Sequence, residues 1–124
     1  DSVRAALETL CTLAKPQPDG RRIAVLGDMT ELGRMGPQAH YEVGKLAAEM
    51  DVDLLYGLGE LSKQTVAGAK DAGLSSSYAF SYKQSLFDAL RGNLREGDVI
   101  LFKGSRVMKL EEVIEWFYRE GDGC

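Results

Sequence analysis

Apolar residues recur along the chain at two spacings, one typical of amphipathic helices and the other of buried strands. In residues 2–14 they fall at offsets of three, four, seven and eleven, which places them on one helical face. Short apolar runs bounded by glycine or polar residues are typical of buried strands. The pattern predicts strands over residues 23–27, 52–58, 78–80 and 99–102, and helices over residues 2–14, 37–50, 60–72, 81–94 and 110–117.

Strands that alternate with helices through short connections predict right-handed crossovers and a mostly parallel sheet covered on both faces. We therefore expect an α/β domain, and 124 residues are enough for one such unit. A helix that comes first in this pattern normally follows a strand, so we expect a further strand upstream of Asp1. The chain starts with Asp rather than Met, and we interpret it as a piece of something longer.

The net charge, the apolar stretches and the cysteines limit which partners and which compartment we expect for this chain. The formal net charge of −4 argues against nucleic acid and anionic membranes as partners, because both usually select a basic surface. No stretch approaches the roughly 20 apolar residues of a membrane span. The two cysteines, Cys11 and Cys124, lie near opposite ends of the sequence, which favours reduced thiols and a cytoplasmic protein.

Ligands of open α/β sheets bind beyond the carboxyl ends of the strands, which directs attention to the loops after Gly27, Leu58, Phe80 and Phe102. The first of these loops carries Asp28 and Glu31. Such carboxylates bind an ammonium group or orient a water, unless they merely cap a turn or face solvent.

The loop after the last strand concentrates groups that bind anions. Lys103, Gly104, Ser105 and Arg106 supply two cations and a hydroxyl where a strand is expected to stop and a helix to start. Backbone N–H groups at a helix start add to this capacity, and a guanidinium binds a carboxylate or phosphate through paired hydrogen bonds. The alternative is a solvated basic corner.

His40 is the only histidine, and its spacing to Val43 and Ala47 places it on the buried side of its helix. A core histidine with satisfied hydrogen bonds is the first interpretation, and support of a site is the second. We expect no metal site built by this chain alone. A phosphate-binding G-x-x-x-x-G-K-S/T loop and a G-x-S-x-G nucleophile motif are both absent from the sequence.

Three segments together resemble a known family. The segment LGDMTELG at residues 26–33 is followed by His40, Val43 and Gly44, and residues 97–101 are followed by KGSR at 103–106 and MKLE at 108–111. Residues 1–7 are similar to the segment that follows an Asn-Ala-Asn-Pro motif. The three resemble the C-terminal domain of the Mur ligases that add D-alanyl-D-alanine. Val107 departs from the pattern, because the family usually has Gly there.

The resemblance implies a Rossmann-like three-layer sandwich in residues 1–120, with residues 121–124 as a flexible tail. It implies a three-domain ligase of the cytoplasm that uses ATP and Mg²⁺ to join D-alanyl-D-alanine to UDP-N-acetylmuramoyl-tripeptide. This domain would bind the dipeptide and close over ATP, with no catalytic residue, metal or cofactor of its own. The expected dipeptide-binding residues are Asp28, Met29, Glu31, Lys103, Gly104, Ser105 and Arg106, with His40 in support.

A second hypothesis is a stand-alone α/β binding or regulatory module that resembles a receiver domain. Asp28 would then be the phosphorylated carboxylate, although the other acidic residues of such a site are missing. A third hypothesis, a complete small-molecule enzyme, is disfavoured because the nucleotide loop and a nucleophile–base pair are absent.

Overall fold

The computed structural model describes residues 2–13 and 20–122. In these ranges the predicted alternation of helices and strands is confirmed. The strands are β1 (Arg22–Gly27), β2 (Leu54–Leu58), β3 (Ser77–Phe80) and β4 (Val99–Lys103). The helices are α1 (Ser2–Leu13), α2 (Gly36–Glu49), α3 (Ser62–Asp71), α4 (Lys83–Asn93) and α5 (Glu111–Asp122), with short 3₁₀ turns at Gly33–Met35 and Arg106–Met108.

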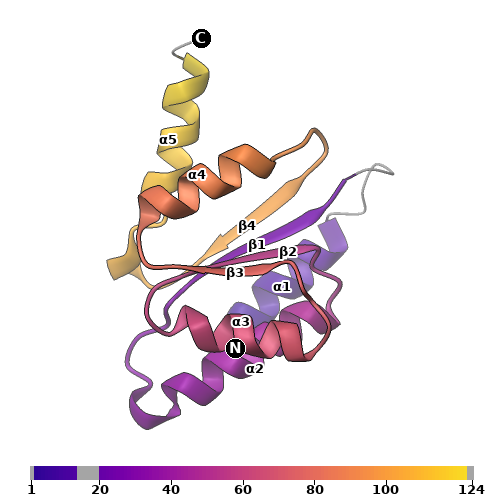
Figure 1. The fold of residues 1–124 in the computed structure, drawn as a ribbon, viewed down its shortest axis with the longest axis vertical. Helices are drawn as coiled ribbons and strands as arrows, with labels where there is room; N and C mark the ends of the chain where they lie inside the picture. The colour runs from indigo at the N-terminus through magenta and orange to yellow at the C-terminus, as the bar shows by residue number, and fades with distance from the viewer. Residues whose placement is uncertain (1, 14–19, 123–124) are drawn as a thin grey trace.

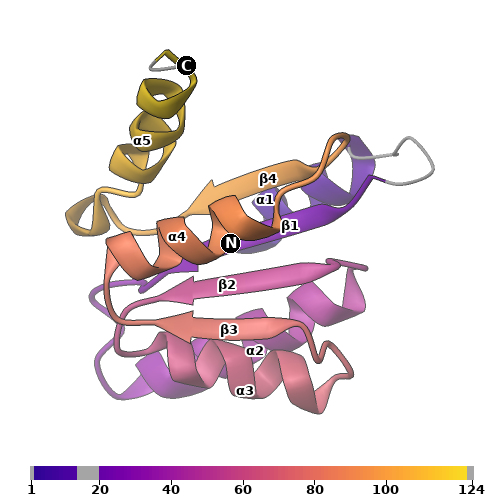
Figure 2. The same cartoon turned by 45° about the horizontal axis from the view of Figure 1, so that its top comes forward.

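The strands form one parallel sheet in the order β3-β2-β1-β4 (Figure 2). β1 lies in the interior of the sheet, with Val25 opposite Tyr56 of β2 on one side and Phe102 of β4 on the other. Parallel strands need helical crossovers, and these cover both faces of the sheet with apolar side chains. The predicted parallel sheet is therefore confirmed.

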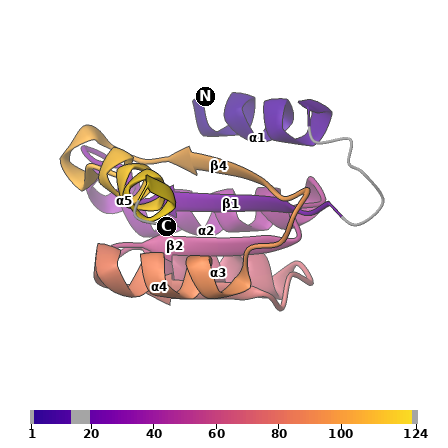
Figure 3. The same ribbon diagram turned by 90° about the horizontal axis from the view of Figure 1, so that it is seen from above.

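Helices pack on both faces, which gives three layers (Figure 1). Ala24 and Leu26 of β1 belong to a cluster with residues of α1, α2 and α3. Ile23 and Val25 belong to a second cluster, with residues of α4 and α5. Successive side chains of a strand point to opposite faces, so the apolar run of β1 supplies both cores. α1 lies alongside β4, the strand at one edge of the sheet (Figure 3).

Some element boundaries differ from the prediction. We expected Ser81 and Gln84 to form a capping box at the start of the fourth helix, and this is wrong. α4 begins at Lys83, so Gln84 is one position too early for such a box, and its amide donates to Asp88 instead. α5 continues to Asp122, so the first two residues of the expected tail are helical, and residues 123–124 lie outside the described part.

α2 and α3 contact each other through glycines. A Cβ atom on Gly44 would lie 1.7 Å from the carbonyl oxygen of Thr65, and one on Gly68 would lie 1.9 Å from that of Tyr41. Real Cβ atoms do not approach oxygen this closely, so both positions require the absence of a side chain. The two helix backbones are thereby held in direct contact.

An ion pair joins the start of β1 to the turn before β4. Arg21 Nε lies 3.0 Å from Asp98 Oδ1, and Arg21 Nη2 lies 2.7 Å from Oδ2. Arg95 N–H donates to the same carboxylate over 2.9 Å. The Asp98 side chain is only 2% exposed. The Arg21 hydrogen bonds, with help from the Arg95 N–H, hold the pKa of Asp98 below its ordinary value of 3.8, against the opposing effect of burial.

Substitution of Gly44 or Gly68 by Ala is expected to destabilise the fold, because the added methyl forces α2 and α3 apart. Overpacking of this kind costs about 1–3 kcal/mol or more in the free energy of unfolding. Gly92→Ala in α4 is the matched control, because nothing lies within 4 Å of its added Cβ. It should leave stability unchanged or raise it by up to about 1 kcal/mol. Chemical denaturation measures all three, and equal effects would contradict the close contact.

Asp98→Asn is expected to lower the free energy of unfolding at pH 7 by about 1–3 kcal/mol, because it leaves Arg21 without its charged partner. A carboxylate with a lowered folded-state pKa stabilises the fold above its unfolded pKa and loses this effect as the pH falls through the folded one. The difference between the variant and the unmodified chain should therefore shrink below pH 3.8. Asp88→Asn, at an exposed position, is the control and should change stability by less than about 0.5 kcal/mol.

Candidate functional site

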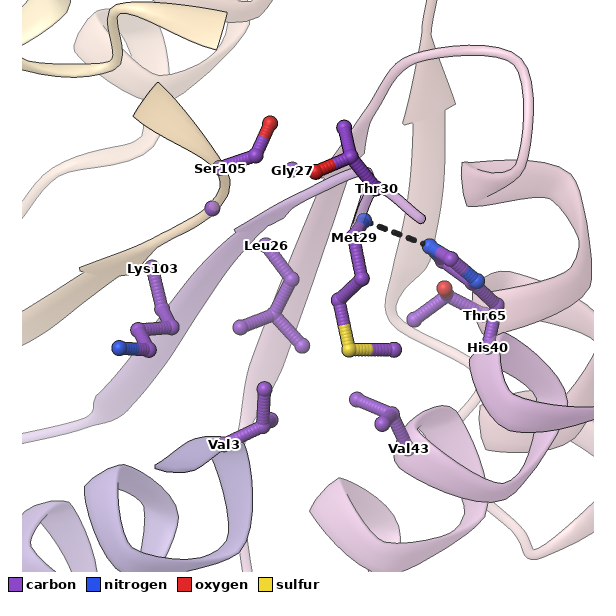
Figure 4. A pocket seen from close by; sticks show the side chains of 11 residues that line it. Val3, Leu26, Gly27, Met29, Thr30, His40, Val43, Thr65, Lys103 and Ser105 are labelled. Carbon is purple, nitrogen blue, oxygen red and sulfur yellow. Dashed lines mark hydrogen bonds between the residues drawn. The ribbon is translucent and has the colours of Figure 1, made fainter. Parts of the chain in front are cut away.

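A cavity of about 190 Å³ opens where β1 and β4 end, on the face of the sheet that α1, α2 and α3 cover. From β1 the chain proceeds to β2 and β3 on one side and later adds β4 on the other, so β1 and β4 flank the point where the strand order reverses. Ligands of open α/β sheets bind at such points. The residues that line the cavity are Val3, Leu26, Gly27, Met29, Thr30, His40, Val43, Thr65, Lys103, Gly104 and Ser105 (Figure 4).

The loop after β1 is anchored to two other segments. The Asp28 carboxylate accepts a hydrogen bond from Leu61 N–H, with distances of 3.1 and 3.3 Å to its two oxygens. Its backbone carbonyl accepts from Ser105 N–H over 3.3 Å. Asp28 thus joins the loops that follow β1, β2 and β4. Glu31 is exposed and has a φ of 65°, a left-handed conformation that is uncommon for residues other than glycine.

His40 is 2% exposed and both of its ring nitrogens have partners. Nδ1 lies 2.7 Å from the carbonyl oxygen of Gly36, one turn earlier in α2. Nε2 accepts a hydrogen bond from Met29 N–H over 3.0 Å, drawn as the dashed line in Figure 4. The expectation of a buried histidine with satisfied hydrogen bonds is confirmed.

The residues of the loop after β4 differ in exposure and in whether they line the cavity. Lys103 and Ser105 are half-buried and line the cavity, whereas Arg106 is exposed and is not among the lining residues. A Cβ on Gly104 would lie 2.9 Å from Leu110 Cδ1 and 3.2 Å from Gly27 Cα, so the two loops approach each other closely at this glycine. Within the described part of the chain, the buried Ser105 hydroxyl lacks a hydrogen-bond partner.

One expectation about this loop is wrong. A long helix does not start at Arg106, because the chain first forms the 3₁₀ turn Arg106–Met108 and Lys109 adopts a left-handed conformation. α5 begins only at Glu111, and the acidic pair Glu111 and Glu112 occupies its first turn. The helix dipole of α5 therefore favours its own carboxylates and adds little to anion binding at Arg106.

The structure brings four of the seven predicted binding residues to the cavity wall, namely Met29, Lys103, Gly104 and Ser105. Asp28, Glu31 and Arg106 are not among the lining residues. Sequence reasoning missed the apolar residues Val3 and Val43, because their helical spacing marks them only as buried. A second hollow of about 480 Å³ lies between α1 and α2, and Val3, Met29 and Val43 line both.

Residues 2–13 and 20–122 contain no group of three or more His, Cys, Asp or Glu side chains placed to hold a metal ion. None of the helices in those ranges combines the length and apolar character needed to cross a membrane.

Relatives with known names match nearly the whole chain. The UDP-N-acetylmuramoyl-tripeptide–D-alanyl-D-alanine ligase of Bacillus subtilis (strain 168) is 34% identical over 115 residues, which is 92% of this chain and 24% of that protein. The ligase of the same name from Synechocystis is 37% identical over 120 residues, which is 97% of this chain and 26% of that protein. The chain thus spans about a quarter of the length of these relatives.

Solved structures also match nearly the whole chain. MurF from Acinetobacter baumannii superposes with a TM-score of 0.75 at 27% identity, over 92% of this chain and 24% of that one. MurF from Thermotoga maritima in complex with ADP gives a TM-score of 0.69 at 26% identity, over 97% of this chain and 26% of that one. The family model described as "Mur ligase, glutamate ligase domain" matches residues 1–106, and the chain therefore belongs to the Mur ligase family.

Proposed function

We propose that this chain is the C-terminal domain of an ATP-dependent ligase of peptidoglycan precursor synthesis. The enzyme joins D-alanyl-D-alanine to UDP-N-acetylmuramoyl-tripeptide in the cytoplasm. The names of the relatives support this reaction. The observation that carries the domain's own role is the cavity at the strand reversal, where Lys103 and Ser105 meet the loop after β1.

The chemistry of the dipeptide matches these groups. D-alanyl-D-alanine carries a carboxylate, an ammonium group and two methyl side chains. The Lys103 ammonium receives the carboxylate at the cavity, where Ser105 forms part of the wall, and Arg106 reaches it from the exposed rim. Met29 and its apolar neighbours contact the methyl groups.

The acidic residues have separate roles in this proposal. The Asp28 carboxylate organises the loop, because its oxygens already accept from Leu61 N–H. Glu31, exposed on the same loop, is the carboxylate that remains for the ammonium group. This domain then acts by proximity, since it holds the amine where the activated tripeptide carboxylate arrives.

ATP, Mg²⁺ and the nucleotide-linked tripeptide act through the other domains of the longer protein. ADP in the Thermotoga maritima relative supports the use of ATP. The described residues do not fit Mg²⁺ on their own, because Asp28 is bound to backbone N–H and no cluster of carboxylates faces the cavity. The receiver-like alternative is not favoured, because the family match extends over residues 1–106.

Removal of either cation is expected to weaken dipeptide binding in the longer protein that contains this domain. Arg106→Ala and Lys103→Met should each raise the dissociation constant for D-alanyl-D-alanine about tenfold, since a hydrogen bond to a charged group contributes about 1.5–3 kcal/mol. Calorimetry with ATP present measures the constant.

Lys70→Ala is the matched control, because Lys70 is exposed in the last turn of α3, at the opposite edge of the sheet. It should bind the dipeptide like the unmodified protein. If Lys103→Met and Arg106→Ala both bind like this control, the proposed carboxylate site is refuted.

The loop role of Asp28 predicts a contrast between two substitutions. Asp28→Ala removes the acceptor for Leu61 N–H and should lower the free energy of unfolding by about 1–2 kcal/mol. Asp28→Asn keeps an acceptor oxygen and loses the charge, so its stability and dipeptide affinity should stay close to those of the unmodified protein. Loss of affinity in a stable Asp28→Asn variant would instead assign the ammonium group to Asp28.

A further inference from the structure

The hydrogen bonds of His40 define the state of its ring. The carbonyl oxygen of Gly36 can only accept, so Nδ1 must carry a proton and donate. The backbone N–H of Met29 can only donate, so Nε2 must be unprotonated and accept. Both contacts are satisfied together only by the neutral ring with its proton on Nδ1.

The Met29 side chain lies at the edge of the cavity, on the side of the larger hollow. Its side chain extends from the loop after β1 into the space between Leu26 and Val43 (Figure 4). It lines both the 190 Å³ cavity and the 480 Å³ hollow between α1 and α2. The Met29 side chain therefore lies, with Val3 and Val43, at the boundary between the two spaces, and its backbone is attached to α2 through the His40 ring.

We propose that His40 is a positioning residue that sets the size of the ligand cavity through Met29. In the Nδ1–H form, His40 holds the Met29 backbone so that the side chain closes the cavity toward the larger hollow. This limits the ligand to small side chains such as the methyl groups of D-alanyl-D-alanine. The ligand part of this inference rests on the proposed function, whereas the ring state and the position of Met29 do not.

Two conservative substitutions separate the two hydrogen bonds. The amide of Gln extends about as far from the backbone as Nε2, so His40→Gln keeps an acceptor for Met29 N–H. The amide of Asn extends only about as far as Nδ1. His40→Asn therefore keeps the donor to the Gly36 carbonyl and loses the acceptor for Met29 N–H. A purely structural role in α2 would favour Asn, whereas the positioning role requires rescue by Gln.

The first measurement uses NMR on the unmodified 124-residue chain. Long-range proton–nitrogen spectra at neutral pH should show a protonated Nδ1 and an unprotonated Nε2 for His40. Hydrogen exchange at the Met29 amide should be slow in the unmodified chain and in His40→Gln. It should be about tenfold faster in His40→Asn, the scale expected for loss of one buried hydrogen bond. The Leu55 amide in the sheet is the internal reference, and its exchange should be equal in all three proteins.

The second measurement compares D-alanyl-D-alanine with a dipeptide that has larger side chains, D-leucyl-D-leucine, in the longer protein. His40→Asn should reduce the preference for the smaller dipeptide about tenfold, and His40→Gln should keep it. A proton on Nε2, or equal Met29 exchange in both variants, would overturn the inference. Because the ring state is measured in the unmodified chain, this holds even if a variant fails to fold. If the NMR results are as expected and the unmodified protein does not bind D-alanyl-D-alanine, the proposed function fails while the positioning of Met29 by His40 stands.

Discussion

The close approach of Gly27 and Gly104, at the carboxyl ends of β1 and β4, determines the geometry of the whole site. A Cβ atom on Gly104 would lie 2.9 Å from Leu110 Cδ1 and 3.2 Å from Gly27 Cα, so a side chain there would push the two loops slightly apart. The contact allows Ser105 N–H to donate to the Asp28 carbonyl, and it brings Lys103 beside residues from α1 and α2. The apolar wall and the polar groups of the cavity therefore share one origin, the point where the strand order reverses.

Local pattern was sufficient to predict the fold because the sheet is buried on both faces. The run from Ile23 to Leu26 is apolar at every position, because its side chains pack alternately into two hydrophobic clusters. A continuous apolar run of this kind has no helical periodicity. Helix starts were less predictable. The Ser81–Gln84 spacing on its own fits a capping box. In the structure α4 begins at Lys83, and the Gln84 amide donates to the Asp88 carboxylate instead.

The site was predictable as a set of strand-end loops, but the partners of its residues were not. The Asp28 carboxylate binds Leu61 N–H, which lies on the loop after β2 and is brought near only by the parallel pairing of β1 and β2. Apolar spacing placed the last helix over residues 110–117, but it did not indicate the 3₁₀ turn at Arg106 or the left-handed Lys109 that precede α5. A long-range contact decides the partner of Asp28, so residue type and offset alone cannot supply it.

The glycine contact between α2 and α3 has no counterpart at α1 among the glycine approaches described, so the two sides of the cavity are held by different kinds of contact. Gly44 and Gly68 hold the helix backbones at a separation with no slack, so the wall that bears His40 and Val43 resists displacement. On the opposite side, α1 contributes Val3 and rests on the edge strand β4. The wall on the α2 side is therefore fixed by contact between two helix backbones, whereas the wall on the α1 side is fixed by side-chain packing.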